Sequence, residues 1–320
     1  MLKFTIRRLI ISFPQIILLS ILVFFLGSLM PGDALSGLID PTVPIEQIER
    51  LREQMGLNNP WYIQYRDWMF AMLQGDFGTS FFKQQPVLDV IGDRMLNTVW
   101  LSLFSAVLIY LIGIPLGLVS GRWNDSPLDS LITGYTYLGF ATPTFIFGLV
   151  LLLVFGYTLG WFPTGGSVGA GVTPGTFEYV VSKIQHLILP SFAIALIGLV
   201  GTVQYLRSGI IETKQKDFIT LARAKGVTEG KVYTRHIFRN SILPIAAFFG
   251  YEITALLGGS LFIETIYGYP GMGRLFLESI SIRDFSVANV LILMYGMLAI
   301  IGTLLSDIIL SIVDPRIRIK

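Results

Sequence analysis

The sequence predicts an all-α polytopic membrane protein with six transmembrane helices and both termini in the cytoplasm. Of its 320 residues, 53% are hydrophobic and 14% are charged, whereas a soluble domain carries about 25% charged residues. Six segments reach the length of about 20 apolar residues that spans a bilayer. They are residues 9–30, 98–120, 131–160, 186–206, 242–263 and 287–313.

The orientation follows from the distribution of lysine and arginine, which are enriched in cytoplasmic loops. With the N-terminus inside, 15 of the 23 Lys and Arg residues fall on the cytoplasmic side. Eight of these 15 lie in residues 207–239, whereas the two short outer loops hold three between them. An even number of spans then returns the C-terminal residues 314–320 to the cytoplasm, and we expect a multi-pass membrane protein.

The first span resembles a signal peptide because Lys3, Arg7 and Arg8 precede it. Its apolar run is too long for the core of a signal peptide, and no small-residue cleavage site follows. We therefore expect residues 1–30 to form a cytoplasmic tail and an uncleaved first helix.

Residues 31–96 form the long outer loop, which is predicted to contain two short helices. Residues 44–56 have apolar side chains at helical spacing and end in Gly56, and residues 61–74 place Trp61, Tyr65 and Trp68 on one face. Tryptophan and tyrosine favour the membrane interface, so these helices are expected to lie on the outer leaflet or the outer rim of the protein.

Residues 97–313 form the core of five further spans, and their few acidic residues need an explanation. Glu252 lies mid-span, where a charge costs on the order of 3 kcal/mol. It either faces a substrate pathway and binds a peptide amino terminus, or is protonated or paired and packs against another subunit. Gln204 is a second pathway candidate. Asp307 is expected to pair with an arginine, and Asp129 to cap the third span.

Small residues recur at spacing four in the second span, at Gly113, Gly117 and Gly121. Such a stripe lets two helix backbones approach closely. The partner is expected either within this chain or in a second subunit.

The cytoplasmic loop 207–241 predicts a basic pair of short helices. Asp217 can cap a helix over residues 218–225, and Gly226 ends it. Thr228 and Glu229 begin a second helix, and Pro244 marks entry into the fifth span. Lys231, Arg235 and Arg239 recur on the second helix at spacing four. A groove on a cytoplasmic protein could receive this pair; the alternative is a loop that only fixes topology.

This loop resembles the EAA loop of ABC importer permeases. The likeness rests on Ala222-Arg-Ala-Lys-Gly226, His236 and Asn240-Ser-Ile-Leu-Pro244. The general pattern has Glu-Ala-Ala where this chain has Thr220, Leu221 and Ala222, and Ile-x-Leu-Pro where it has residues 236–239. Both departures are typical of the permeases for oligopeptides, dipeptides and nickel.

Further motifs resemble the same subset and extend over nearly the whole chain. The nearest likeness is to the first of the two oligopeptide permease subunits, which carries a long loop after its first span. The motifs are Pro31-Gly-Asp33, Gly56-Leu-Asn, Gln64-Tyr65, Gly75-Asp-Phe-Gly78, Glu264-Thr-Ile-Tyr-Gly-Tyr-Pro-Gly-Met-Gly-Arg274, Arg283-Asp284-Phe285 and Asp314-Pro-Arg-Ile317.

The resemblance implies a type I ABC importer permease fold and a non-enzymatic subunit that moves peptides, most closely oligopeptides, into the cytoplasm. The chain has no Gly-x-x-x-x-Gly-Lys-[Ser/Thr] stretch for ATP. The implied partners are two cytoplasmic ATP-binding subunits that bind ATP and Mg²⁺, a second homologous permease and an extracellular peptide-binding receptor. No cofactor, metal or nucleic acid is expected on this chain.

The same resemblance assigns residues to two sites. An outer gate or receptor contact is implied at Tyr267, Tyr269, Pro270 and Arg274. Coupling to the ATPase is implied at Asp217, Phe218, Ala222, Arg223, Ala224, Lys225, Gly226, Arg235, His236 and Asn240.

Other functions stay open. Within the family, the substrate could be a dipeptide, a nickel chelate or glutathione. A secondary transporter would show inverted repeats or proton-relay residues, and an intramembrane enzyme would need a Ser/His or paired-Asp arrangement within its spans. The sequence shows neither arrangement, which favours the importer.

Overall fold

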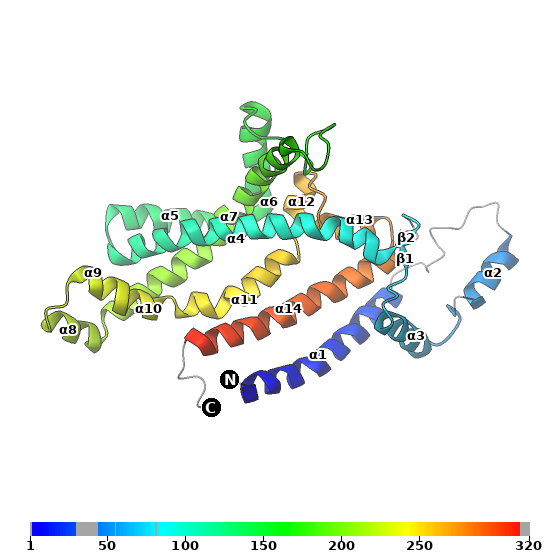
Figure 1. The fold of residues 1–320 in the computed structure, drawn as a ribbon, viewed down its shortest axis with the longest axis horizontal. Helices are drawn as coiled ribbons and strands as arrows, with labels where there is room; N and C mark the ends of the chain where they lie inside the picture. The colour runs from blue at the N-terminus through cyan, green and yellow to red at the C-terminus, as the bar shows by residue number, and fades with distance from the viewer. Residues whose placement is uncertain (1, 30–43, 55, 81, 314–320) are drawn as a thin grey trace.

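The computed structural model describes residues 2–29, 44–54, 56–80 and 82–313. The Pro31–Asp33 and Asp314–Ile317 motifs and the tail 314–320 lie outside these residues. The described chain is a bundle of long helices (Figure 1). The long helices are α1 (Leu2–Ser28), α4 (Val87–Arg122), α7 (Phe177–Lys214), α11 (Leu243–Leu257) and α14 (Phe285–Val313).

These helices confirm five of the six predicted spans, with shifted ends. α4 begins 11 residues before the predicted span, and α7 begins nine residues before His186. The charged and polar residues of these extensions are tolerated because the helices continue beyond the hydrocarbon layer. α11 is followed at Gly258–Ser260 by a break and then by the short helix α12 (Leu261–Ile266), so this span is not a single straight helix.

The third predicted span, residues 131–160, is bent instead of straight, and the described residues give six spans when this bent pair is counted as one. α5 (Pro127–Ala141) and α6 (Thr144–Leu151), which continues into the π-helical turn η1 (Leu152–Thr158), meet at an angle of 107°. The break falls at Thr142, whose backbone is extended, directly before Pro143. A proline disfavours the helical conformation of the preceding residue, so α6 projects away from the bundle (Figure 1).

The outer loop contains the two predicted helices, α2 (Ile45–Gln54) and α3 (Trp61–Leu73), and a two-stranded hairpin, β1 (Thr79–Ser80) with β2 (Gln85–Pro86). α3 packs on the end of α1, where the Tyr65 hydroxyl lies 2.9 Å from that of Ser20 and the Trp68 ring lies 5.3 Å from that of Phe24. The hairpin is held by a hydrogen bond from Ser80 to Asp284. A last helix, α13 (Met272–Ser281), leads into α14.

The glycine stripe of α4 packs on α7, so its partner lies within this chain. A Cβ atom at Gly117 would lie 2.9 Å from Cβ of Leu206, and one at Gly121 would lie 2.8 Å from Cβ of Ile210. Cβ atoms do not approach so closely, and only glycine allows this helix separation.

We expect Gly117→Leu to separate α4 from α7 and to lower the thermal stability of the detergent-solubilised protein, because an overpacked contact costs about 1–3 kcal/mol. Gly134→Leu on α5 is the matched control, since a Cβ there meets nothing within 4 Å. Size-exclusion chromatography after heating measures both. Equal stability of the two variants would contradict this packing.

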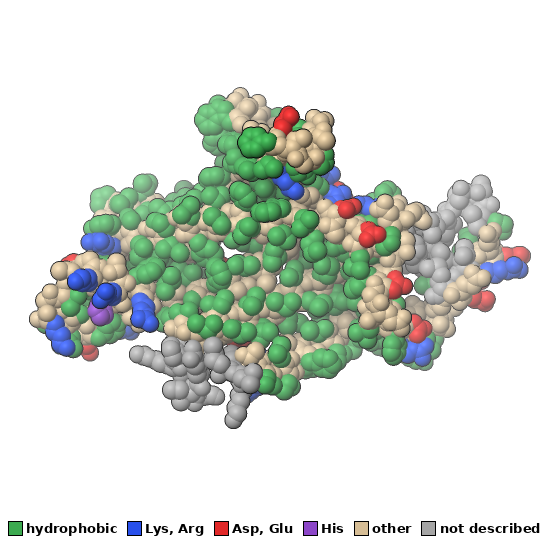
Figure 2. Space-filling view, in the orientation of Figure 1, with side chains coloured by type: hydrophobic (Ala, Val, Ile, Leu, Met, Phe, Trp, Pro, Cys, Tyr) green, Lys and Arg blue, Asp and Glu red, His purple; other side chains and the backbone are tan. Residues whose placement is uncertain are grey.

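Apolar and basic side chains occupy different parts of the surface, as expected for a membrane protein. Hydrophobic side chains cover the flank of the bundle, and basic side chains gather at the end that carries the 217–241 segment (Figure 2). Near α1 and α14, Arg8 lies 3.1 Å from Asp307, which confirms the expected arginine partner of Asp307.

Candidate functional site

The predicted basic helix pair is present between α7 and α11. Its first helix, α8 (Asp217–Ala224), begins after Lys216, and Asp217 stands in its first turn instead of capping it with its side chain. The prediction of an Asp217 cap is therefore wrong, although an acidic residue in a first turn still interacts favourably with the helix dipole.

The turn between the two helices depends on Gly226. Gly226 has φ +76°, its N–H donates to Arg223 O at 2.9 Å, and Val227 N–H donates to Ala222 O at 3.2 Å. This pair of hydrogen bonds is the Schellman arrangement, which requires a left-handed residue after the helix. Glycine adopts that conformation without a Cβ penalty, which confirms the predicted helix end.

The second helix begins at Glu229 as predicted and is not a regular α-helix. It consists of α9 (Glu229–Lys231), a π-helical turn η2 (Val232–Ile237) and α10 (Phe238–Ser241). The wider i→i+5 turn shifts the register of the side chains. The spacing-four stripe expected for Lys231, Arg235 and Arg239 therefore does not run straight along one face.

An apolar cluster fixes this pair to the bundle. Ile219, Val232 and Ile237 are fully buried against Leu206 and Ile210 of α7. Burial of one such side chain contributes about 1.5–3 kcal/mol. The pair is therefore a firmly attached continuation of α7 and not a loose loop.

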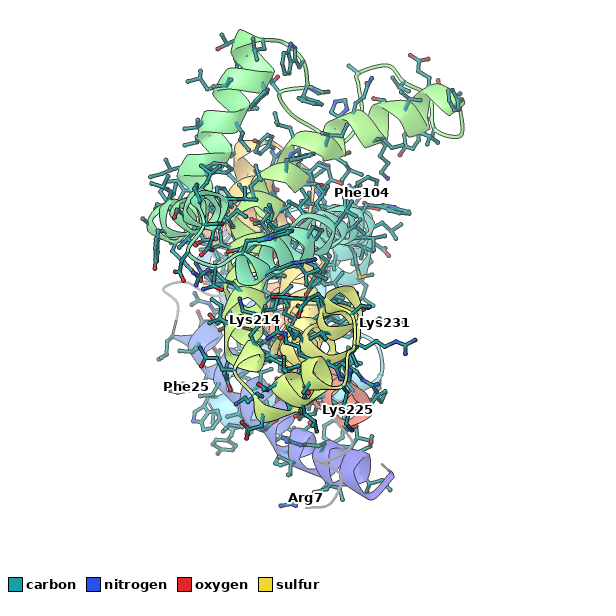
Figure 3. All side chains as sticks on the ribbon, turned by 90° about the vertical axis from the view of Figure 1, so that its left-hand side faces the viewer. Arg7, Phe25, Phe104, Lys214, Lys225 and Lys231 are labelled. Carbon is teal, nitrogen blue, oxygen red and sulfur yellow. The ribbon has the colours of Figure 1, made fainter. Side chains whose placement is uncertain are left out.

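Most of the predicted coupling residues lie on the outer surface of the pair. Ala222 is buried in the apolar cluster, and His236 is half-buried. Phe218 and Leu221 are 43% and 55% exposed, and at a spacing of three in α8 they are neighbours on one face of the helix. Lys225 and Lys231 lie at the end of the molecule that faces the viewer in Figure 3. The exposed residues of the predicted set are Asp217, Phe218, Arg223, Ala224, Lys225, Gly226, Arg235 and Asn240.

Charged groups link the two helices of the pair. Arg223 Nε donates to Glu229 at 2.7 Å across the Gly226 turn. The Arg223 guanidinium holds the pKa of the Glu229 carboxyl below its usual value. Such an exposed ion pair contributes little stability. The stability of the helix pair therefore comes from the apolar cluster, and the ion pair connects the two helices across the turn.

Two cationic side chains of α7, Lys214 and Arg207, bind the region where α4 ends and α5 begins. The Lys214 ammonium donates to Gly121 O at 2.9 Å and to the Asn124 side chain. It thereby satisfies a carbonyl at the end of α4, where a cation also meets the negative end of the helix dipole.

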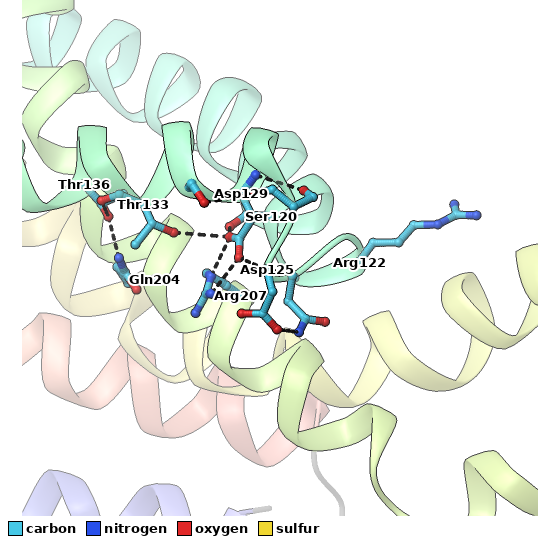
Figure 4. Close-up of polar contacts among 12 residues, drawn as sticks. Ser120, Arg122, Asp125, Asp129, Thr133, Thr136, Gln204 and Arg207 are labelled. Carbon is cyan, nitrogen blue, oxygen red and sulfur yellow. Dashed lines mark hydrogen bonds and ion pairs between the residues drawn. The ribbon is translucent and has the colours of Figure 1, made fainter.

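The second contact is a buried ion pair that the sequence did not predict. Arg207 Nε and Nη2 each donate to Asp129 at 2.8 Å, and Ser120 and Thr133 also donate to that carboxylate (Figure 4). The Asp129 side chain is 3% exposed. Ser126, and not Asp129, caps α5 by accepting from Asp129 N. We call Asp129, Arg207 and Lys214 the α7 clamp.

The predicted outer gate is a tightly packed turn. Tyr267 and Tyr269 are 2% and 0% exposed, and their hydroxyls donate to Gly148 O and Asn97 O at 2.9 and 3.0 Å. Asn97 in turn donates to Pro270 O. The two tyrosines therefore fix the turn to α4 and α6, and they do not reach the surface.

Glu264 organises this turn, a role that its place in a sequence motif did not predict. Its carboxylate is fully buried and accepts from Thr98 Oγ1 and Arg274 N, each at 3.0 Å. A Cβ at Gly271 would lie 2.4 Å from this carboxylate. The Arg274 side chain donates to Gly268 O and Glu278.

The two predicted pathway residues lie apart. Glu252 lines a pocket among α4, α6, α7 and α11 and accepts from the Tyr110 hydroxyl. Gln204 does not line this pocket; it donates to Thr136 and ties α7 to α5 (Figure 4). Within the part of the chain that the structure describes, no group of three or more His, Cys, Asp or Glu residues could hold a metal.

Comparisons with known proteins match the whole chain. Residues 113–319 match the family described as binding-protein-dependent transport system inner membrane component, and residues 1–102 match its N-terminal part. The oligopeptide transport system permease protein AppB of Bacillus subtilis is 39% identical over 99% of this chain and 100% of its own length. The glutathione transport system permease protein GsiC of Escherichia coli K12 is 32% identical, with both chains fully covered.

A solved structure shares the fold. The methionine ABC transporter MetNI in an inward-facing conformation superposes with a TM-score of 0.56 at 12% identity, covering 71% of this chain and 97% of that one. At this identity the likeness concerns the fold alone. Together with the family matches and the apolar helices, it shows that this chain is a multi-pass inner membrane protein and belongs to the binding-protein-dependent transport system inner membrane components, the permeases of ABC importers.

Proposed function

We propose that this permease imports oligopeptides into the cytoplasm, powered by ATP hydrolysis on separate ATP-binding subunits. The full-length likeness to an oligopeptide permease supports the substrate class. A second homologous permease completes the pathway, and an extracellular receptor delivers the peptide. The helix pair α8–α10 faces the cytoplasm and docks on an ATP-binding subunit.

The observation that carries the coupling role is the exposed face of the pair. Phe218 and Leu221 expose apolar surface beside the cations Arg223 and Lys225, while the opposite face is buried on α7. A topology-fixing loop needs only the cations. Apolar side chains held outward on a rigid support fit a helix that enters a groove on another protein.

The α7 clamp extends this role into the membrane. Since α7 continues directly into the pair and Arg207 binds α5 through Asp129, a push on the pair moves α7, the end of α4 and α5 together. The clamp thus transmits closure of the ATP-binding subunits to the helices around the pathway.

Proteoliposomes test the proposed function. The permease is purified with the subunits that copurify with it and reconstituted with its receptor, and uptake of a labelled oligopeptide is measured. We expect uptake that requires both ATP and receptor. Uptake driven by a proton gradient without ATP, or purification without any ATP-binding subunit, would contradict the importer and favour a secondary transporter.

Glutathione is the second candidate substrate, because a glutathione permease also matches over the whole chain. Competition in the same proteoliposomes separates the two. An excess of unlabelled glutathione is expected to leave oligopeptide uptake unchanged; complete inhibition would favour glutathione.

A further inference from the structure

We propose that the pocket containing Glu252 binds the α-ammonium group of a peptide during import, with the Glu252 carboxylate as its counter-charge. This inference rests on the proposed function and specifies the chemistry that the pathway recognises. It makes Glu252 a substrate-binding residue and leaves Gln204 as a packing residue.

The pocket has the size and composition of a ligand site. Its volume is about 360 Å³, within the range of about 300–1,000 Å³ that is typical of small-molecule pockets. Most of its wall is apolar, and a few polar groups face it. The apolar wall includes Leu101, Ile109, Ile194, Ile197, Ala255 and Leu256.

The position of the pocket fits a substrate that enters from outside. α11 runs from Leu243 near the basic end toward Leu257, and the pocket extends from Glu252 past Gly259 to Glu264. It therefore lies at the middle of the helix bundle and extends to Glu264, next to the packed turn that contains Tyr267 and Tyr269.

The two acidic residues of the pocket differ in how their charge is satisfied. Glu264 is fully buried and accepts from two donors, which marks it as structural. Glu252 is only half-buried and, within the described part of the chain, accepts from the Tyr110 hydroxyl alone. Both carboxylates accept from neutral donors, and an acid placed mid-membrane costs about 2.5–3.5 kcal/mol unless it is paired. Of the two, only the half-buried Glu252 is exposed enough for a cationic ligand to reach it.

An α-ammonium group supplies the missing cation. Every unblocked peptide carries this group, with a pKa of about 7.7–8.0, whatever its sequence. A site for it therefore selects peptides as a class without selecting their side chains. Tyr251, which is 50% exposed and lines the pocket, offers an aromatic ring to the same cation.

Photo-labelling of the purified, receptor-free permease complex tests this proposal. The probes are two copies of one tripeptide with a photoreactive central residue, one with a free amino terminus and one acetylated. We expect the free peptide to label the pocket wall in the wild type, Glu252→Gln to lower that labelling about tenfold, and the acetylated peptide to label weakly in both. Glu178→Gln, an exposed acid in the first turn of α7, is the matched control and should label like the wild type.

One further variant and one further measurement keep the outcomes separate. Ala255→Phe fills the pocket while keeping the carboxylate, and should abolish labelling by the free peptide. Equal labelling by the two peptides, or undiminished labelling of Glu252→Gln, would overturn the proposal. Loss of the second permease from Glu252→Gln would also overturn it, because Glu252 would then pair with that subunit. ATP-driven uptake by the wild type reports separately on the proposed function.

Discussion

Gly226→Glu is expected to abolish receptor-stimulated ATP hydrolysis and peptide uptake while the protein stays folded in the membrane. Gly226 has φ +76°, and a Cβ there would meet nothing within 4 Å. The penalty is therefore backbone strain of about 1–2 kcal/mol, which tilts α8 and its exposed Phe218 and Leu221 away from their docking direction. The loss is measured as ATPase activity of the reconstituted complex with saturating receptor and peptide.

Two control variants separate the effect of backbone strain at residue 226 from the effect of the added carboxylate. Gly230→Glu adds the same carboxylate to the same surface, at a glycine without positive φ and with open space around its Cβ, and should keep most of the activity. Gly226→Asn should retain more activity than Gly226→Glu, since asparagine tolerates the left-handed conformation. Wild-type ATP hydrolysis by Gly226→Glu would remove the coupling role from this turn.

Asp129→Ala is expected to destabilise the protein more than any other single change considered, because it leaves the Arg207 guanidinium without its bidentate partner. Removing one member of a fully buried ion pair costs about 3–5 kcal/mol, and since the Arg207 side chain is 21% exposed and can bind water, we expect a cost at the lower end of this range. The loss should appear as a lower midpoint of heat-induced aggregation in detergent and as lower yield in the membrane.

The double variant Asp129→Ala with Arg207→Met tests whether the cost comes from an unpaired charge. Replacing both members of a buried pair by apolar groups is often nearly neutral, so we expect most of the stability to return. If the clamp transmits motion, the double variant should still show reduced peptide transport per ATP. A double variant less stable than Asp129→Ala would contradict the ionic account.

Local signals predicted the features that depend on a few adjacent residues. Gly226 predicted the end of α8 because a Schellman turn needs a residue with positive φ. The apolar runs predicted six spans because their length is set by the bilayer, and five of them are candidate spans without a sharp bend. The glycines at spacing four in α4 predicted a close helix contact, and the structure identifies α7 as the partner.

Features that depend on residues far apart in sequence could not be predicted in this way. Asp129 and Arg207 are 78 residues apart, and nothing local in either pairs them. The π-helical turn in residues 232–237 has no proline or other local signal within it. Pro143 explains where the chain breaks between α5 and α6, and it does not by itself set the angle of 107°. Glu264 lies in a recognisable motif, yet its role depends on Thr98 of α4, which is distant in sequence.

Site-specific photo-crosslinking from the α8 surface tests most directly whether the helix pair α8–α10 docks on an ATP-binding subunit. The chain has no cysteine, so Leu221→Cys, labelled with a benzophenone-maleimide before reassembly, carries one reactive position. Trp161→Cys, in the segment after η1, is the control, because Trp161 is 65% exposed against 55% for Leu221. We predict that Leu221→Cys crosslinks to an ATP-binding subunit and Trp161→Cys does not. No adduct from Leu221→Cys in an active complex, or one with the external receptor, would contradict this account.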